Sequence, residues 1–302
     1  MNYKEFMKKF PDEKAIIDYF IKIRYSEGIR CPYCKNEKVY QKKDRLKVFD
    51  CNFCGRSFSI FKDTIFEKTT TDLQKWFFAI HLVLNAKKGI SALQLQREIG
   101  VTYKTAWRML HQIRQAMEDR NNDDFFDTIV EIDETYVGGK PRKSNKRDNY
   151  KKGGGLKRGR GTKKTPIIAV VDREERKVFA KVANPNKRGQ KLTGRQLLDV
   201  INQVCKGKNV KVISDEYRAY NKLKGTNYIH FRIDHTKMFV DGDIHTNTIE
   251  SFWAIVKRAF YGTYHRISKK YMQDYINECS FRYNNRNVDI SFDLLIKNTI
   301  LI

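Results

Sequence analysis

Three acidic residues stand where apolar segments end or begin in an otherwise strongly basic chain. Asp133 closes the run TIVEID, Asp215 closes VKVISD, and Glu250 opens an apolar helical pattern after 34 intervening residues, 216 to 249. Two carboxylates from central strands and one from a helix can converge on hard divalent cations, which take oxygen ligands. Two such ions, roughly 3.5–4 Å apart, clamp the attacking and leaving oxygens of a phosphodiester. The three acids therefore predict metal-dependent phosphodiester chemistry.

The run HTNTIESFWAIVK at 245–257 contains the third acid and permits two interpretations. Asn247, Glu250 and Lys257 are spaced to share one face of a helix. Apolar residues fall on a neighbouring face that we expect to be buried: Ile249, Trp253, Val256 and Phe260. Asn-x-x-Glu before an apolar run is also the pattern of a capping box. Asn247 and Glu250 are thus candidates for a helix cap and for an active site, with Glu250 favoured over Asn247 as the residue that faces the metals.

Four of the six cysteines form two close pairs, Cys31/Cys34 and Cys51/Cys54. Their pattern is C-x2-C-x16-C-x2-C, so two tight turns each offer two thiolates. This arrangement makes a tetrahedral site for structural Zn²⁺. Paired cysteines in a chain without a secretion signal indicate metal binding rather than disulfides. We therefore predict a zinc ribbon near the N-terminus. The pattern does not distinguish a ribbon that binds DNA, one that binds protein and one that only stabilises the fold of this region.

Composition indicates a nucleic-acid partner. The 302 residues include 60 Lys and Arg against 35 Asp and Glu, a net charge of +25. Such an imbalance favours a polyanion, and no basic amphipathic helix with a lipid-facing stripe favours a membrane surface instead. No apolar run approaches the roughly 20 residues that span a bilayer, and MNYKEFMKKF lacks the apolar segment of a signal peptide. We expect a cytoplasmic protein, associated with the nucleoid when active, and no membrane partner.

Helical patterns dominate the first two predicted domains. Domain 1–66 holds a helix around EKAIIDYFIKIRY followed by the zinc ribbon, and domain 67–122 holds three helices. The last two, SALQLQREIG and TYKTAWRMLHQIRQAM, fit a helix-turn-helix that binds DNA. On this interpretation Tyr103, Lys104 and Arg108 face DNA. The residues expected to face inward are Ala106, Met109, Leu110 and Ile113.

Strand patterns dominate the third predicted domain, 123–302. Three apolar strands (DTIVEIDETYVGG, TPIIAVVDRE and RKVFAKVAN) precede the helix GRQLLDVINQVC. The strand VKVIS, a sharp turn, the strand NYIHFRID and the helix from 245 onward follow. This is the element order of a ribonuclease-H-like fold. The predicted fold class is therefore multidomain, α+β and α/β: a zinc ribbon, a helix-turn-helix and a ribonuclease-H-like catalytic domain.

A basic insertion at 140–164 interrupts this domain. It carries twelve Lys and Arg against one Asp, a net +11 and close to half of the charge of the whole chain. With its glycines it cannot bury a core. It is either a solvated loop or an arm that follows DNA phosphates, and we favour the arm because neutralising a polyanion strengthens binding. The residues predicted to contact DNA are Lys151, Lys152, Lys157, Arg158 and Arg160.

Other polar residues near the candidate site receive structural or supporting roles. Glu134 and Glu216 each follow a candidate acid, and strand alternation turns such neighbours away. Asp172 precedes a charged turn, so we expect it to be solvated. His245 and His265 are expected to contact DNA or to hold the site.

The motifs together resemble a known family. DETYVGG at 133–139, SDEYRAY at 214–220 and HTNTIESFWAIVKRAFYGTYH at 245–265 resemble the DDE transposases of bacterial insertion sequences. The nearest resemblance is to the group with an N-terminal zinc ribbon (the IS-fifteen-ninety-five group), because CPYC, CNFCGRSFS and the helix-turn-helix also fit. The resemblance implies that Asp133, Asp215 and Glu250 form the acidic triad, with Lys257 as the basic residue one helical face along. In this group the third position can be Asn, and Asn247 occupies that place.

The resemblance also implies an activity: cutting of element ends and joining of the freed 3′-hydroxyl to target DNA with Mg²⁺ or Mn²⁺. Double-stranded DNA, both element ends and target, would be the partner, bound by a homodimer or larger assembly. Two alternatives share the architecture: a catalytically silent DNA-binding regulator, and a structure-specific nuclease that cleaves without joining. The gathered carboxylates argue against a pure binder, which gains nothing from negative charge near phosphates.

Overall fold

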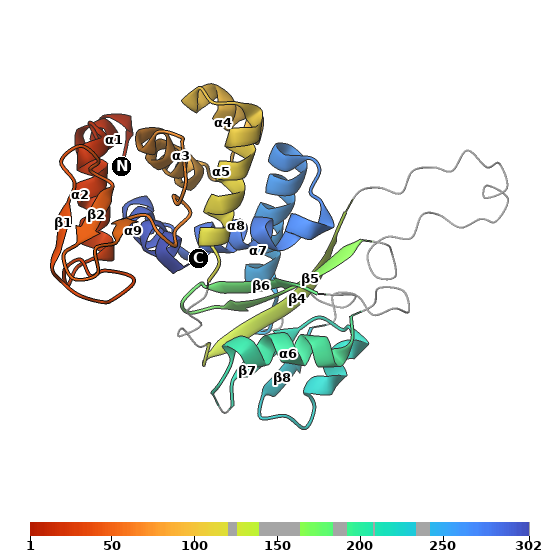
Figure 1. Ribbon diagram of the computed structural model, residues 1–302. Helices are drawn as coiled ribbons and strands as arrows, with labels where there is room; N and C mark the ends of the chain where they lie inside the picture. Colours follow the sequence, from red (N-terminus) through yellow and green to blue (C-terminus); the bar gives the residue numbers. More distant parts are fainter. Residues whose placement is uncertain (120–125, 139–163, 184–191, 208, 234–241, 302) are drawn as a thin grey trace, which may run out of the picture. The chain divides into compact units, whose positions relative to one another are not determined.

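The computed structural model describes residues 1–119, 126–138, 164–183, 192–207, 209–233 and 242–301 (Figure 1). The chain forms two compact units. The first comprises Met1–Glu118 together with Asn285–Ile302, and the second comprises Asp119–Asn284. The chain thus leaves the first unit, builds the second and returns to the first.

The first unit combines helices with a small antiparallel sheet. Its helices are α1 (Tyr3–Lys9), α2 (Glu13–Arg24), α3 (Leu73–Asn85), α4 (Ala92–Ile99), α5 (Tyr103–Ala116) and α9 (Val288–Asn298), followed by the short η5 (Thr299–Leu301). The strands β1 (Val39–Gln41), β2 (Val48–Cys51) and β3 (Ser57–Ser59) are hydrogen-bonded in that order. Short strands therefore join the two cysteine pairs, as predicted for the ribbon.

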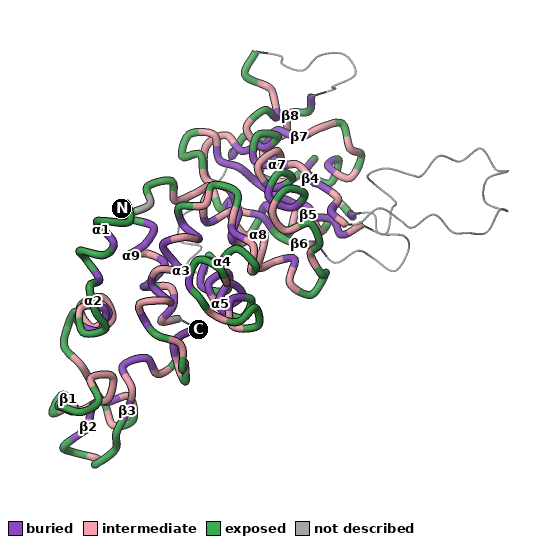
Figure 2. The backbone as a smooth tube through the Cα atoms, turned by 90° about the horizontal axis from the view of Figure 1, so that it is seen from above, coloured by how far each residue is buried: buried purple, intermediate pink, exposed green. Residues whose placement is uncertain are grey.

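Aromatic rings form much of the core of this first unit. Phe10, Phe77 and Phe292 are fully or almost fully buried, and Figure 2 shows buried stretches along α3 and α9. The Phe10 and Phe77 ring centroids lie 5.2 Å apart, and Phe292 of α9 lies 5.9 Å from Phe77. The hydroxyl of Tyr19 also donates to the carboxylate of Asp293. Residues 285–302 therefore belong with the first unit, and the predicted 123–302 domain ends at 284 instead.

The second unit is a mixed α/β fold. Its strands are β4 (Ile129–Val137), β5 (Thr165–Asp172), β6 (Val178–Val182), β7 (Lys211–Ser214) and β8 (Ile229–Arg232). Its helices are α6 (Gly194–Val204), η2 (Arg218–Leu223), α7 (Asn247–Ala259), the π-helical η3 (Phe260–Tyr264), η4 (Lys269–Tyr271) and α8 (Met272–Asn284). None of the described helices in either unit is both long and apolar enough to cross a bilayer.

The five strands form one sheet in the order β6-β5-β4-β7-β8. β4, β5 and β6 pair antiparallel, whereas β4–β7 and β7–β8 pair parallel. The element order is the predicted one for a ribonuclease-H-like fold. Every residue of β5 is buried, which explains its continuous apolar run, because a strand covered on both faces does not alternate.

Helices cover both faces of this sheet. α6 packs on one face with Val130 and Ile132 of β4, whereas α7 and α8 pack on the other with Val137. Figure 1 shows α6 on one side of the strands and α7 and α8 on the other. Residues 131, 133 and 137 of β4 therefore share the face that α7 covers, since side chains alternate along a strand.

A close approach at the first residue of α6 supports one prediction about stability. A Cβ on Gly194 would lie 2.5 Å from the carbonyl oxygen of Ala219 and 2.6 Å from Cβ of Lys222, both in η2. Gly194→Ala must displace η2, so we expect it to lower the free energy of unfolding by about 1–3 kcal/mol. Urea denaturation measures this loss. Gly262→Ala is the matched control, because nothing lies within 4 Å of its Cβ position; an equal loss in both variants would contradict the steric explanation.

Candidate functional site

The pairing of β4 with β7 brings two of the candidate acids together. The strands run parallel with Glu131 opposite Ile213. The same register carried two residues further sets Asp133 opposite Asp215, which directly follows β7. Paired strands lie about 4.8 Å apart, so the two carboxylates leave neighbouring backbone positions. Both side chains are half-buried.

The start of α7 lies over the face of the sheet that carries Asp133. Glu131, on that face, accepts a hydrogen bond through Oε2 from the backbone N–H of Ile249 at 2.9 Å. Glu250 follows Ile249 in the first turn of α7 and is exposed. Its Oε1 accepts a hydrogen bond from the hydroxyl of Thr246 at 3.0 Å. The helix therefore delivers Glu250 to the same side of the sheet as Asp133.

Asn247 does not cap α7. The helix begins at Asn247, its N-cap residue is Thr246, and no side chain makes a cap hydrogen bond there. The capping-box interpretation of Asn247 and Glu250 is therefore wrong. Asn247 is exposed, and its backbone N–H donates to Nδ1 of His245 at 3.4 Å. Capping cannot explain these two residue types at the start of the helix.

The apolar side of α7 is buried as predicted. Ile249, Trp253, Val256 and Phe260 are at most 3% exposed. The ring of Trp253 lies 5.2 Å from that of Phe252, so Trp253 is a core residue. Lys257, on the other side of the helix, is exposed.

The three acids are not gathered as tightly as the cysteines. In the described ranges, only Cys31, Cys34, Cys51 and Cys54 bring three or more potential ligand atoms of His, Cys, Asp or Glu within 4.8 Å of one another. Ligands shared by two ions about 3.5–4 Å apart spread over a wider span than the ligands of one ion. Asp133 lies in the middle of β4 and not at its end, whereas Asp215 directly follows β7 and Glu250 lies in the first turn of α7. The arrangement of the three acids is thus an open one.

Tyr220 lies close enough to the carboxylates of Glu134, Asp133 and Asp215 for their charges to affect its pKa. It is fully buried in η2, and its hydroxyl donates to Oε2 of Glu134 at 2.9 Å. Burial raises the pKa of Tyr220 well above its usual value, and the nearby carboxylates of Glu134, Asp133 and Asp215 raise this pKa further. The phenol therefore stays protonated and donates. Glu134 is buried on the opposite face from Asp133, which confirms its predicted structural role.

Asp172, at the end of β5, differs from its prediction. Its side chain is only 2% exposed, whereas the sequence indicated a solvated residue. Oδ1 accepts the backbone N–H of Glu175 at 2.8 Å, and Oδ2 accepts the hydroxyl of Thr128 at 3.3 Å. The carboxylate organises the turn that follows β5, and these hydrogen bonds compensate for its burial.

The two candidate histidines occupy different surroundings. His245 is half-buried, with Nδ1 3.0 Å from Nη2 of Arg173 and its carbonyl accepting from the same Nη2 at 2.6 Å. These contacts favour the role of holding the site over that of touching DNA. His265 follows η3, is exposed and adopts a positive φ of 53°.

Sequence reasoning missed Glu131, Arg173 and Tyr220. Glu131 is a fully buried carboxylate inside an apolar strand. A charged residue two positions before Asp133, and hence on the same face, was the available signal. Nothing local to Arg173 or Tyr220 indicates their partners.

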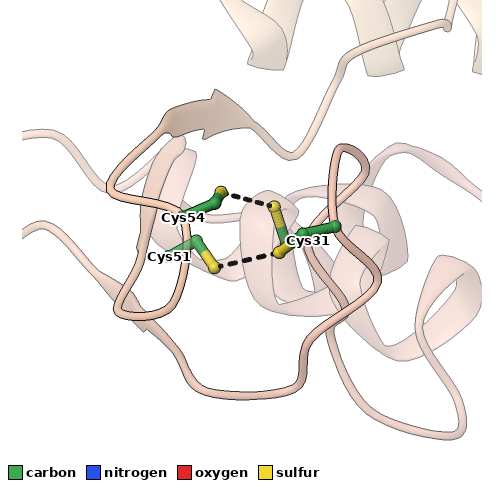
Figure 3. A group of neighbouring side chains, drawn as sticks. Cys31, Cys51 and Cys54 are labelled. Atoms are coloured by element: carbon green, nitrogen blue, oxygen red, sulfur yellow. Dashed lines mark hydrogen bonds between the residues drawn. The ribbon is translucent and has the colours of Figure 1, made fainter.

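The four cysteines form a compact group in the first unit, and Figure 3 shows Cys31, Cys51 and Cys54 with their sulfur atoms close together. The Sγ atoms of Cys31 and Cys54 lie 3.7 Å apart, and those of Cys34 and Cys51 lie 3.5 Å apart. Zn–S bonds of about 2.3 Å give tetrahedral S–S edges of about 3.8 Å. The backbone N–H of Cys54 lowers the pKa of Cys51 below its usual value, which favours the thiolate. The distances between the four sulfur atoms suit zinc.

The helix pair α4–α5 presents the predicted faces. Thr102 caps α5 by accepting the N–H of Thr105 at 3.2 Å, and Gly100 ends α4 with a φ of 62°. Tyr103, Lys104 and Arg108 are exposed. The residues expected to face inward are buried: Ala106, Met109, Leu110 and Ile113.

The predicted basic arm lies almost entirely outside the described residues. Lys151, Lys152, Lys157, Arg158 and Arg160 all fall in the undescribed segment 139–163.

Comparison with known families decides the identity of the chain. Residues 126–284, more than half of the 302, match the ISXO2-like transposase domain. Residues 11–57 match the transposase zinc-ribbon domain. The chain belongs to this transposase family. The match to the transposase domain ends at residue 284, where the second unit also ends. The family is the DDE group with an N-terminal zinc ribbon, so the resemblance inferred from the motifs is confirmed.

Two curated relatives have sequences similar to that of this chain. One, from Halobacterium salinarum, is an uncharacterized protein in the transposable element ISH50; it is 29% identical over 91% of this chain and 92% of its own length. The other, an uncharacterized transposase-like protein of Haemophilus influenzae, is 30% identical over 33% of this chain and 79% of its own length.

Solved transposase structures show only a faint likeness. The pre-cleavage Mos1 transpososome matches with 13% identity and a TM-score of 0.29 over 73% of this chain and 76% of that chain. The Mos1 strand transfer complex matches with 13% identity and a TM-score of 0.31 over 74% and 77%.

Proposed function

We propose that this transposase cleaves the ends of an insertion sequence and joins the freed 3′-hydroxyl to target DNA with Asp133, Asp215 and Glu250 as its metal ligands. The observation that carries the proposal is the register of β4 on β7, which sets Asp133 opposite Asp215. The start of α7 then adds Glu250 from above the same face. Asn247 is the alternative third ligand, because its exposed amide oxygen leaves the same first turn.

The donor set fits Mg²⁺ or Mn²⁺. The three side chains offer only oxygens, and none of them is fully buried. Hard divalent ions take such carboxylates together with water. Burial, and after it the carboxylates of Glu134, Asp133 and Asp215, raise the pKa of Tyr220. A cation bound beside Asp133 and Asp215 would offset the negative charge of these carboxylates. Bound there, the ions would lower the pKa of water and stabilise the charge that develops on the phosphate.

Two displacements at phosphorus make up the proposed reaction. In the first, a water oxygen bonds to phosphorus at the element end while the P–O3′ bond breaks, leaving a 3′-hydroxyl. In the second, this hydroxyl bonds to a target phosphorus, and the target 3′-oxygen leaves. Lys257 lies seven residues beyond Glu250, about 10 Å along α7. It is exposed, and we assign it the role of holding a DNA phosphate near the acids.

An assay with end DNA, target DNA and Mg²⁺ or Mn²⁺ tests the proposed reaction. Joined product supports the transposase. Nicked end DNA without joining indicates a nuclease, and shifted but uncut DNA indicates a silent regulator. Either of these two outcomes overturns the proposal.

Outside the catalytic unit, we assign the remaining elements to DNA and zinc. The exposed face of α5, with Tyr103, Lys104 and Arg108, enters a groove of end DNA as a recognition helix does. The cysteine group holds structural Zn²⁺. We assign a DNA contact to His265, which follows η3 and is exposed. Joining two ends requires both ends in one complex, so the active form is at least a dimer on DNA.

The basic insertion supports a prediction about salt dependence. Replacing residues 140–164 by an uncharged Gly/Ser segment of equal length should weaken DNA binding and flatten its salt dependence. The cause is the loss of phosphate contacts, each of which contributes about 0.9 to the slope of log K against log salt. Fluorescence anisotropy from low to moderate salt measures the slope. Because the replacement keeps the length, an unchanged slope would show that the insertion is only a solvated loop.

A further inference from the structure

A buried carboxylate on the catalytic strand substitutes for the missing cap of α7. Ile249 is the third residue of this helix, so its N–H has no intrahelical acceptor. Thr246, the N-cap, supplies no side-chain cap. Oε2 of Glu131 accepts the Ile249 N–H instead, at 2.9 Å and across 118 residues of sequence. A carboxylate at a helix N-terminus is also favoured by the helix dipole.

Arg173 ties the same carboxylate to the chain that leads into α7. Its Nε donates to Oε1 of Glu131 at 2.6 Å. Its Nη1 donates to the carbonyl of Asp243 at 2.5 Å, and its Nη2 donates to the carbonyl of His245 at 2.6 Å. The backbone N–H of Arg173 in turn donates to Ile129 of β4 at 3.1 Å. The guanidinium of Arg173 thus connects Glu131 of β4 to two backbone carbonyls in the segment that precedes α7.

This network lies between two of the proposed metal ligands. Glu131 is two residues before Asp133 on the same face of β4, and Ile249 is one residue before Glu250. Glu131 is fully buried, and the side chain of Arg173 is 14% exposed. Stability alone does not explain a buried ion pair, because apolar residues of similar volume often give an equal or higher free energy of unfolding. Hydrogen bonds of defined geometry can instead fix the distance between β4 and the start of α7 more closely than apolar packing does.

We propose that Glu131 and Arg173 are positioning residues that fix the start of α7, and with it Glu250, over Asp133. The inference rests on the proposed function for its catalytic meaning, because Asp133 and Glu250 must be ligands for their spacing to matter. Neither residue touches the metals or DNA in this assignment. They act through the backbone of 243–249.

Three variants test the inference. Arg173→Lys keeps the charge but loses the planar fork that reaches two carbonyls. Glu131→Gln keeps the shape of the side chain but breaks the ion pair. Glu278→Gln is the matched control: Glu278 is fully buried, accepts from Arg282 at 2.5 Å and from Tyr264 at 2.7 Å, and lies in α8 within the same unit.

Two measurements separate positioning from general destabilisation. Hydrogen exchange of the metal-free protein reports the Ile249 amide, which should lose protection in Arg173→Lys and Glu131→Gln but keep it in Glu278→Gln. Mn²⁺ titration followed by electron paramagnetic resonance should show affinity lowered about tenfold in the first two variants, as for other groups that orient metal ligands. The control should keep wild-type affinity even if it melts earlier.

The outcomes distinguish this inference from the proposed function. If Asp133→Asn abolishes Mn²⁺ binding while Arg173→Lys and Glu131→Gln keep both wild-type affinity and Ile249 protection, the positioning role is overturned and the metal site stands. If Asp133→Asn binds Mn²⁺ as the wild type does, the proposed function fails. The exchange measurement then still decides whether Glu131 and Arg173 fix the start of α7.

Discussion

Asp133→Asn and Asp215→Asn should each abolish cleavage of end DNA while leaving the fold and DNA binding intact. On the proposed function, each substitution removes a ligand charge, and ions bound there would contribute several kcal/mol of transition-state stabilisation. Their loss corresponds to at least about a thousandfold in rate. Stability should not fall, because Asp133 and Asp215 lie opposite each other in register and their repulsion in the metal-free protein is relieved. Single-turnover cleavage of labelled end DNA measures the loss.

The melting temperature with and without Mn²⁺ tests metal binding at the same site independently of cleavage. Mn²⁺ should raise the melting temperature of the wild type, because a ligand that binds only the native state stabilises it. Both Asn variants should lose most of this rise. Glu216→Gln is the matched control, since Glu216 follows Asp215 directly and is exposed. Glu216→Gln should cleave and respond to Mn²⁺ like the wild type; retained cleavage in either Asn variant would sink the metal-site proposal.

Cys34→Ser should lose the metal and the order of the ribbon while the rest of the first unit stays folded. Structural zinc contributes apparent free energies of about 10–16 kcal/mol to small metal-dependent folds. The ribbon has little else to hold it, because its strands contain three or four residues and such short strands are not stable alone. The rings of Phe49 and Phe58, on neighbouring strands of the ribbon, stack at 6.0 Å.

Metal analysis and proteolysis check this prediction. The wild type should hold one zinc per chain, and Cys34→Ser should hold far less. Limited proteolysis should then cut within 31–59 and spare α3, whose Trp76 and Phe77 are fully buried. Cys279→Ala is the control, because Cys279 is buried in α8 of the second unit and lies outside the cysteine group. Unchanged zinc content in Cys34→Ser would contradict a four-cysteine site.

Local patterns predicted what depends on spacing along the chain. The cysteine spacing indicated the group that the structure brings within 4.8 Å. Helical periodicity identified the buried side of α7 and that of α5, because a repeat near 3.6 residues places apolar side chains on one face. The apolar runs before Asp133 and Asp215 indicated strands, and their order along the chain indicated the fold. These features follow from backbone geometry that neighbouring residues share.

Long-range pairing decided the features that local patterns left open or got wrong. Asn-x-x-Glu matched a capping box, yet the acceptor at the start of α7 is Glu131, 118 residues away from Ile249. Asp172 looked solvated, yet Thr128 and the turn to Glu175 bury it. The predicted domain 123–302 includes α9, yet Phe292 of this helix packs with the aromatic rings of the first unit.

The chemically competent residues and their spacing can be read without a structure: two acids that follow apolar runs, a third that opens an apolar helical pattern, and two cysteine pairs spaced for zinc. How these residues lie relative to one another depends on the tertiary structure. Asp133 lies opposite Asp215 only because β4 and β7 pair in parallel with that register. The start of α7 lies over the same face of β4, where the Ile249 N–H donates to Glu131. Strand register and the burial of a charge both depend on partners far along the chain, so no local window of residues contains them.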